Sequence, residues 1–153
     1  MADTTSGMVA QNRRARHDYD ILEQFEAGIV LTGSEIKSVR DHRVQLQGSY
    51  ARVKNGELWL EEANIAAYAQ AGYSGHAPDR NRKLLLHKRQ ITHIMERVGE
   101  QGLTIIPLSM YLKGGRAKVE IGLARGLHHY DKRHQIAERD AERQMQRAVR
   151  QRA

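Results

Sequence analysis

The dipeptide Asn55-Gly56 constrains the fold of this chain more than any other feature. It stands between two short runs of strand-forming residues, "SYARVK" and "ELWLEE". Asparagine followed by glycine suits the two positive-φ positions of a type I′ turn, whose twist matches that of two antiparallel strands. The sequence therefore predicts a β-hairpin over residues 49–65.

Two further segments have the composition of strands. Residues 103–126 carry the pair Gly114-Gly115 between apolar runs, which predicts a second hairpin turning at that pair. Residues 19–31 place polar residues between apolar ones, which predicts a strand. We expect that strand to bend at Gly28, because a glycine inside a strand often marks a bend. Several short strands with little helix favour a small β-barrel or sandwich.

Two short helices are predicted between these strands. Thr32, followed three residues later by Glu35, fits a capping box, in which each side chain binds the backbone N–H of the other residue. Within residues 83–102, apolar residues recur at helical spacing, and Gly99 or Gly102 is expected to end that helix. The apolar positions are Ile91, Ile94, Met95 and Val98.

The charge of the chain indicates a polyanionic partner. Its 153 residues suit one domain, and 25 Lys and Arg against 18 Asp and Glu give a formal net charge of +7. Such a balance favours nucleic acid or an acidic membrane surface. Basic residues gather at positions 13–17, 80–88 and 113–118 and in the tail after residue 130.

Several classes of protein are excluded or disfavoured by the same sequence. No apolar run approaches the length of about 18 residues that a transmembrane helix needs. The N-terminal residues "MADTTSGMVAQ" lack the features of a secretory signal, so a cytoplasmic protein is expected. The absence of cysteine excludes disulfides and thiolate metal sites.

The two ends of the chain differ from its middle. Residues 1–11 are small and polar and are predicted to be a mobile leader. Residues 131–153 contain no Gly, Pro or aromatic residue, and on a helical wheel they form an arginine stripe opposite an alanine-rich face. Like charges at i,i+4 oppose an isolated helix, so this tail is predicted to be disordered alone and helical against phosphates. A helix packed on the domain is the alternative. The stripe consists of Arg139, Arg143, Arg147 and Arg150.

The segment "LHHYDKRH", residues 127–134, suggests three kinds of chemistry. His128, His129, Asp131 and His134 could bind a metal, but adjacent histidines point in different directions and no H-E-x-x-H motif is present. A histidine pair could cleave RNA, but no motif supplies a positioned base, acid and electrophile together. Contact with a nucleic-acid backbone is favoured. A histidine-dependent ribonuclease and a generic basic OB module are the alternatives.

Five blocks of the sequence resemble, in family order, the signature blocks of the small protein B family, the SsrA-binding proteins. They cover residues 12–140 and are "NRRARHDYDI", "EAGIVLTGSEIKSVR", "GSYARVKNGELWLEEANI", "RKLLLHKRQI" and "GLHHYDKRHQIAERD". The resemblance implies a mainly β fold with short helices. An OB-type antiparallel barrel over residues 12–130 would precede a basic tail over residues 131–153, disordered when free.

The resemblance also implies a function without catalysis, metal or cofactor. The protein would bind the tRNA-like domain of transfer-messenger RNA and enter stalled ribosomes with elongation factor Tu, which binds the same RNA. Trans-translation would then begin, with the tail helical in the empty mRNA channel against small-subunit rRNA. We expect a monomer that does not bind membranes.

The positions that the resemblance assigns fall into two groups. The implied contacts with transfer-messenger RNA are Asn12, Arg13, Arg14, His17, Glu26, Leu85 and Lys118. The implied ribosomal contacts are Tyr130, Asp131, Lys132 and Arg133 at the decoding centre, followed by the arginine stripe. Without the resemblance, Glu26 could equally pair with a neighbouring arginine, and Leu85 would be assigned to the core. Family members commonly have glycine where this chain has His42.

Overall fold

The computed structural model describes residues 7–68, 75–126 and 143–145 of the chain. Its helices are α1 (Ala15–Asp18), α2 (Gly33–Arg40) and α3 (Lys88–Gln101). Its longer strands are β2 (Tyr19–Ile29), β4 (Tyr50–Lys54), β5 (Glu57–Glu61), β8 (Thr104–Lys113) and β9 (Arg116–Gly126). The shorter strands are β1 (Gly7–Gln11), β3 (Val44–Gln45), β6 (Asn64–Ile65) and β7 (Arg82–Leu85).

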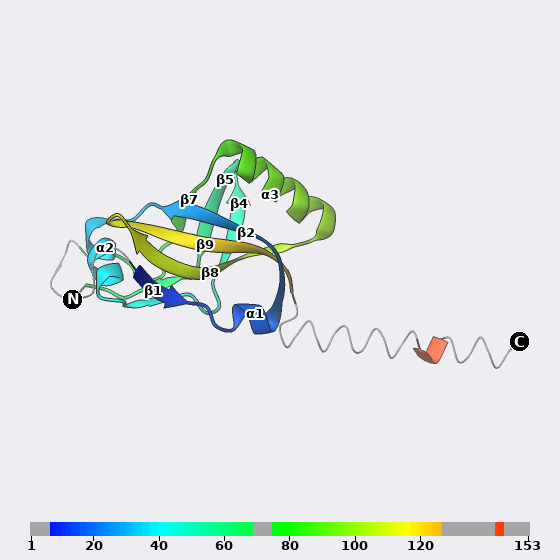
Figure 1. The fold of residues 1–153 in the computed structure, drawn as a ribbon, viewed down its shortest axis with the longest axis horizontal. Coiled ribbons are helices and arrows are strands. Elements are labelled where there is room, and N and C mark those ends of the chain that lie inside the picture. The colour runs from blue at the N-terminus through cyan, green and yellow to red at the C-terminus, as the bar shows by residue number, and fades with distance from the viewer. Residues whose placement is uncertain (1–6, 69–74, 127–142, 146–153) are drawn as a thin grey trace, which may run out of the picture.

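The strands pair in an antiparallel ring. The order in the larger sheet is β1-β8-β4-β5-β7-β2-β9, and β9 pairs again with β8. Strand β1 lies beside β8 outside this ring (Figure 1). Strands β3 and β6 form a separate pair. The predicted mainly β fold with short helices is confirmed.

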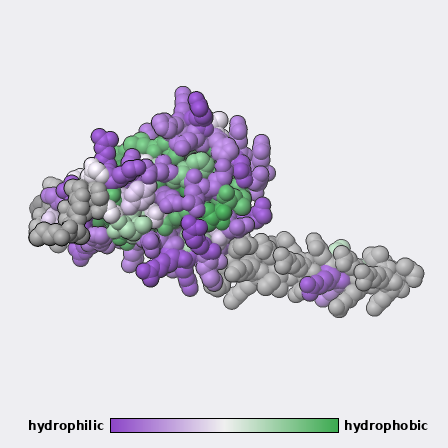
Figure 2. All heavy atoms as spheres, viewed as in Figure 1, coloured by the Kyte–Doolittle hydropathy of each residue, from purple (hydrophilic) through white to green (hydrophobic). Residues whose placement is uncertain are grey.

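The inside of the ring holds the main hydrophobic core. Alternation along each strand turns every second side chain inward, as on β5, where Leu58 and Leu60 are both fully buried. Helix α3 adds Ile94, while Met95 beside it stays 45% exposed. The face of the molecule seen in Figure 2 is mainly hydrophilic, with smaller hydrophobic areas between the hydrophilic ones. That face of the molecule is therefore largely polar.

Local sequence signals predicted both hairpins. Asn55 and Gly56 have φ values of 54° and 75°, and they join β4 to β5. Gly114 and Gly115, with φ values of 59° and 79°, join β8 to β9. Such positive values suit asparagine and glycine, so the predicted turns are confirmed.

The helix signals were equally informative. The reciprocal capping box of Thr32 and Glu35 opens α2. Of the two glycines proposed to end α3, Gly102 forms the cap, in a left-handed conformation with φ of 62°. His42 also has a positive φ, of 60°, at the position where glycine is common in the resembling family. A side chain at such a backbone position is unfavourable relative to glycine.

The leader and the strand boundaries need correction. Gly7–Gln11 form β1 and pair with β8, so the mobile leader predicted over residues 1–11 is wrong for residues 7–11, whereas residues 1–6 lie outside the described residues. Val9, which is 8% exposed, anchors β1. The sequence did not predict this strand because its apolar residues are too few to show an alternation. Strand β7 was not predicted either. The register between β2 and β9 shifts between Ile21 and Glu23 and then runs without a shift to Gly28, so the bend expected at Gly28 stays a prediction.

A buried ion cluster holds α2 against β7. Glu35 and Arg82 are both fully buried, and the Nε atom of Arg82 donates a hydrogen bond to Glu35. Arg82 also donates to the carbonyl oxygens of Ala63, at 2.9 Å, and Pro78, at 3.0 Å. Arg80 donates to Glu35 Oε1 at 2.5 Å. These two arginines of the basic stretch 80–88 therefore support the fold, and Arg82 does not face solvent.

Burial and pairing act in opposite directions on Glu35. Burial alone would raise the pKa of its carboxyl group, because the charged form loses hydration. Hydrogen bonds from Arg80, the Thr32 N–H and Arg82 outweigh burial and lower the pKa to about 2. Glu35 is therefore an anion at neutral pH and compensates the buried Arg82.

Candidate nucleic-acid interface

Three strands bring Glu26, Leu85 and Lys118 to one depression on the outer surface. Gly28 of β2 pairs with Leu85 of β7 on one side and with Lys118 of β9 on the other. Glu26 lies two residues before Gly28, so its side chain is on the same face. The depression measures about 390 Å³, and its other lining residues are Gly28, Leu86, His87 and Gln90.

Gly28 lets β2 and β7 approach closely at the centre of this site. A Cβ atom at Gly28 would lie 3.3 Å from the Cβ atom of Leu85. That separation is tight for two carbon atoms, so a larger residue would push Leu85 away. The glycine thereby sets the position of Leu85 beside the charged groups.

Leu85 supplies an exposed apolar surface. Alternation along β7 buries Leu84, which is 1% exposed, and turns Leu85 outward, where it is 50% exposed. The interpretation of Leu85 as a core residue is therefore wrong. An exposed leucine between charged groups can cover an unstacked base or a ribose.

Glu26 is held as an anion by a tyrosine and nearby lysines. The hydroxyl group of Tyr111 donates a hydrogen bond to Glu26 Oε2, and Lys113 Nζ lies 3.7 Å from Glu26 Oε1. The hydrogen bond from Tyr111 and the charges of Lys113 and Lys118 lower the pKa of Glu26, although partial desolvation opposes them. Burial and the same hydrogen bond raise the pKa of Tyr111, so its hydroxyl group stays a donor. The alternative in which an arginine pairs with Glu26 is not what the described residues show.

Lys118 provides the cation of the site. It is half-buried on β9, directly opposite Tyr111 of β8. Within residues 7–68, 75–126 and 143–145, no ion pair of Lys118 is recorded. Its ammonium group is thus available to a phosphate, while Glu26 offers an acceptor nearby.

The basic N-terminal block divides into structural and exposed residues. Asn12 is buried, its side-chain amide donates to the Pro107 carbonyl at 2.9 Å, and its backbone N–H donates to the Leu108 carbonyl at 2.8 Å. Asn12 therefore fixes the segment to β8. Arg13, Arg14 and His17 are exposed and can reach a ligand.

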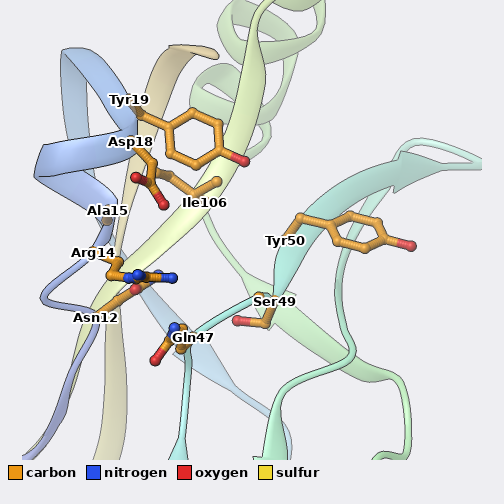
Figure 3. Close-up of a pocket in the computed structure, with 10 residues that line it drawn as sticks. Asn12, Arg14, Ala15, Asp18, Tyr19, Gln47, Ser49, Tyr50 and Ile106 are labelled. Carbon is orange, nitrogen blue, oxygen red and sulfur yellow. The ribbon is translucent and has the colours of Figure 1, made fainter. Parts of the chain in front are cut away.

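Asn12 also lines two further depressions of about 250 Å³ each. One is lined by Arg13, Arg16, Ser109 and Glu120, among others. Figure 3 shows the other, where Arg14 projects between Tyr19 and Gln47 and Ser49 faces them from the opposite side. Arg14 thus faces a different depression from Arg13, and neither residue lines the depression of Lys118.

The predicted ribosomal contacts lie largely outside the described residues. Tyr130, Asp131, Lys132, Arg133, Arg139, Arg147 and Arg150 are in this group. Arg143 is described, in a helical segment with Gln144 and Met145, and all three are exposed. The histidines that could form a metal site or a nuclease, His128, His129 and His134, also lie outside the described residues.

Two of the described histidines link elements of the fold. His76 lies between Ser34 Oγ, at 2.8 Å, and the Ile65 carbonyl oxygen, at 2.9 Å, and links α2 to β6. His93 of α3 contacts the carboxylate of Glu23 on β2 at 3.0 Å. In the part of the chain that the structure describes, no group of three or more His, Cys, Asp or Glu is placed to hold a metal ion. Across the same residues, no helix combines the length and apolar character needed to cross a bilayer.

Comparison with known proteins connects these features to a family. The family model described as SmpB protein matches residues 9–151. The SsrA-binding protein of Roseiflexus castenholzii is 58% identical over 147 residues, covering 95% of this chain and 93% of the relative. The SsrA-binding protein of Thermobifida fusca is 54% identical over 144 residues, covering 94% of this chain and 90% of the relative.

A solved structure is similar as well. It is described as "tmRNA-SmpB: a journey to the center of the bacterial ribosome". The matching chain is 51% identical with a TM-score of 0.65, and the match covers 76% of this chain and 82% of that chain. Because the family model and the relatives span nearly all of the sequence, this chain belongs to the SmpB protein family.

Proposed function

We propose that this protein binds the tRNA-like domain of transfer-messenger RNA, or SsrA, and brings it to stalled ribosomes for trans-translation. The observation that carries this proposal is the depression formed by Glu26, Leu85 and Lys118. Residues far apart in the sequence converge there, and together they offer an anion, an apolar surface and a cation. The relatives are SsrA-binding proteins, which supports the same function.

Each side chain of the depression has a distinct task in binding. Lys118 pairs with a phosphate and releases a condensed counterion. Leu85 covers an unstacked base or sugar, and Glu26 accepts hydrogen bonds from a base amino group or a ribose hydroxyl group. Tyr111 keeps the Glu26 carboxylate oriented toward these donors. The depression thereby recognises RNA by shape and by a few polar contacts.

The ring of strands is, in this proposal, an OB-type barrel that presents the RNA surface. Strand pairing from β8 through β4, β5, β7, β2 and β9 back to β8 supports this architecture. Exposed Arg13, Arg14 and His17 add phosphate contacts outside the depression of Lys118. Asn12 acts indirectly, by fixing these residues to β8.

The tail has a separate task on the ribosome. Tyr130, Asp131, Lys132 and Arg133 contact the decoding centre, and the arginine stripe follows the small-subunit rRNA. Elongation factor Tu joins through the shared RNA. The protein acts as a cytoplasmic monomer that needs no cofactor, metal or membrane.

The protein is not an enzyme, because the SmpB family is a non-enzymatic RNA-binding family. A histidine-dependent ribonuclease would cleave labelled RNA during incubation with the purified protein. We expect intact RNA with and without divalent metal. Cleavage that disappears in His129→Ala or His134→Ala would contradict this assignment.

Binding of the tRNA-like domain should depend on Lys118. Lys118→Ala removes the cation of the depression and should weaken binding about 5- to 150-fold in a filter-retention titration. Glu26→Ala should act in the same direction. The control is Arg40→Ala, which removes an exposed cation from α2 and should leave the affinity nearly unchanged. Unchanged dissociation constants for both site variants would refute the proposed site.

Deletion of residues 131–153 should separate the two tasks. The truncated protein retains Glu26, Leu85 and Lys118, so its affinity for the tRNA-like domain should stay within about threefold of that of the parent. Peptide tagging in a stalled-translation extract should be lost, because the arginine stripe is gone. Tagging at the parental level by the truncated protein would show that the tail has no such task.

A further inference from the structure

Trp59 lies on the outer surface of the ring. It is the one tryptophan of the chain. Leu58 and Leu60 on either side of it are fully buried, so alternation along β5 turns Trp59 outward. The indole is half-buried and belongs to neither hydrophobic core. A large aromatic side chain in this position is available to a ligand.

The groups around Trp59 leave its ring uncovered by cations. Its cross-strand partners are Arg52 on β4 and Lys83 on β7. Each cation is held by a neighbouring carboxylate: Arg52 Nη2 lies 2.9 Å from Glu61, and Lys83 Nζ lies 3.3 Å from Glu57. Within the described ranges, the cation recorded over an aromatic ring is instead Lys37, above Tyr68. Positive charge therefore flanks the indole without occupying its face.

A depression of about 380 Å³ opens at the indole. This volume lies in the range of about 300–1,000 Å³ that small-ligand sites occupy. The side-chain amides of Asn55 and Asn81 line it and offer both donors and acceptors to the edge of a base. Lys54 lines it too and can meet a phosphate, and Glu57 and Glu61, which pair with Lys83 and Arg52, complete the lining. The chemistry of the depression suits a nucleotide.

Trp59 is also a close neighbour of the first depression. It pairs with Lys83, and Leu85 lies two residues further along β7 on the same face. Such diagonal neighbours are roughly 7–8 Å apart, so one RNA strand can reach both side chains. We infer that Trp59 is a stacking platform for an unpaired nucleobase of the same RNA that Lys118 contacts. This inference rests on the proposed function and extends its surface from Leu85 to β5.

Stacking, more than charge, should hold this base. Arg52, Lys54 and Lys83 are nearly balanced by Glu57 and Glu61, so few counterions are released here. An aromatic ring accepts any base, because every base has a π-face. The platform therefore adds affinity with little sequence preference and little dependence on salt.

Fluorescence of the full-length protein tests the inference directly. A base stacked on an indole quenches its emission, and Trp59 is the only source of tryptophan emission in the chain. The probe is a transcript of the tRNA-like domain of transfer-messenger RNA. We expect emission to fall with the same dissociation constant that filter retention gives. Unchanged emission at saturation would overturn the inference, whether or not any variant folds.

Variants give a second, independent measurement. Trp59→Leu removes the ring and should weaken binding about 5- to 150-fold, whereas Trp59→Phe keeps a ring and most of the affinity. Trp59→Leu should leave the slope of affinity against salt unchanged, and Lys118→Ala should reduce it. Met95→Ala is the matched control, because Met95 is an exposed apolar residue on α3.

The outcomes separate this inference from the proposed function. Parental affinity in Trp59→Leu together with weak binding in Lys118→Ala would remove the platform and leave the function intact. A parent protein that does not bind the transcript would refute the function and the platform together. Three results together would support both: quenching in the parent protein, loss of affinity in Trp59→Leu, and retained affinity in Trp59→Phe and Met95→Ala.

Discussion

Two glutamates in this protein each lie beside two cations, yet they have opposite surroundings. Glu35 is fully buried, and its partners Arg80 and Arg82 donate directly to it. The Glu26 side chain is 44% exposed, and Lys113 stands 3.7 Å away. In the first cluster, each charge is satisfied by another within the protein. In the second, water or a ligand completes the surroundings of each charge.

This difference explains why one cluster supports the fold, whereas the other suits the RNA binding that we propose. A buried ion pair gains little net stability but becomes costly when one partner is removed. An exposed cluster contributes little to stability because water screens it. Its groups can exchange water for phosphate and ribose at a small cost. The contrast gives predictions on stability and on binding.

Replacement of Glu35 should have the largest effect on stability. Glu35→Gln keeps the shape of the side chain but leaves the buried guanidinium group of Arg82 without a counter-charge. We expect a loss of about 3–5 kcal/mol in the free energy of unfolding, measured with urea. The control is Glu57→Gln, which breaks an exposed ion pair with Lys83 and should cost less than about 1 kcal/mol. Equal losses in the two variants would remove the distinction between buried and exposed clusters.

Acid should reveal the same cluster without any substitution. The pKa of Glu35 is about 2 in the folded protein, against 4.5 for an ordinary glutamate. Because the folded value is the lower one, the stability that this group contributes is complete above pH 4.5 and is lost as pH falls toward 2. The loss amounts to about 3 kcal/mol. The free energies of unfolding of the parent and of Glu35→Gln should converge as pH falls through this range. Parallel curves of this free energy against pH would argue against a paired Glu35.

The smallest effect is expected at the exposed cluster, and on binding alone. Tyr111→Phe removes the hydroxyl group that donates to Glu26 and should weaken RNA binding about 2- to 10-fold. The pKa of Glu26 should rise, so the acid limb of the binding profile moves to higher pH. Tyr50→Phe is the control, because the Tyr50 hydroxyl group binds a different carboxylate, that of Glu61. An unshifted profile in Tyr111→Phe would mean that the tyrosine does not position Glu26.

The elements that the sequence predicted correctly depend on neighbouring residues. The turns at Asn55-Gly56 and Gly114-Gly115 and the capping box at Thr32 each follow from a few adjacent positions. Two of the strands that it missed depend on distant residues. β7 places Arg82 inward, where alternation would call for an apolar residue, and Glu35 from α2 together with the carbonyl oxygens of Ala63 and Pro78 makes this possible. β1 is a strand because its backbone pairs with that of β8, about 100 residues further along the chain.

The candidate site was predicted through the family resemblance more than through local patterns. The structure adds a physical reason, since Gly28 pairs with both Leu85 and Lys118. Tyr111 was missed, although the sequence contained a signal for it. A hairpin that turns at Gly114-Gly115 sets Lys113 against Arg116 and hence Tyr111 against Lys118. Burial of Arg82 had no comparable signal, because the sequence gives no register between β7 and α2.

The pairing of β2 with β9 has a consequence for synthesis of the protein. Gly28 is made early and Lys118 late, and the depression between them does not exist until β9 has been translated. The chain between β2 and β9 forms a long loop when the two strands pair. Closing it costs only slightly more entropy than closing a shorter loop, since the cost grows with the logarithm of the loop length. A nascent chain that stops before β9 therefore lacks Lys118 and the complete depression. On the function that we propose, unfinished copies of this protein would not compete with complete ones for transfer-messenger RNA.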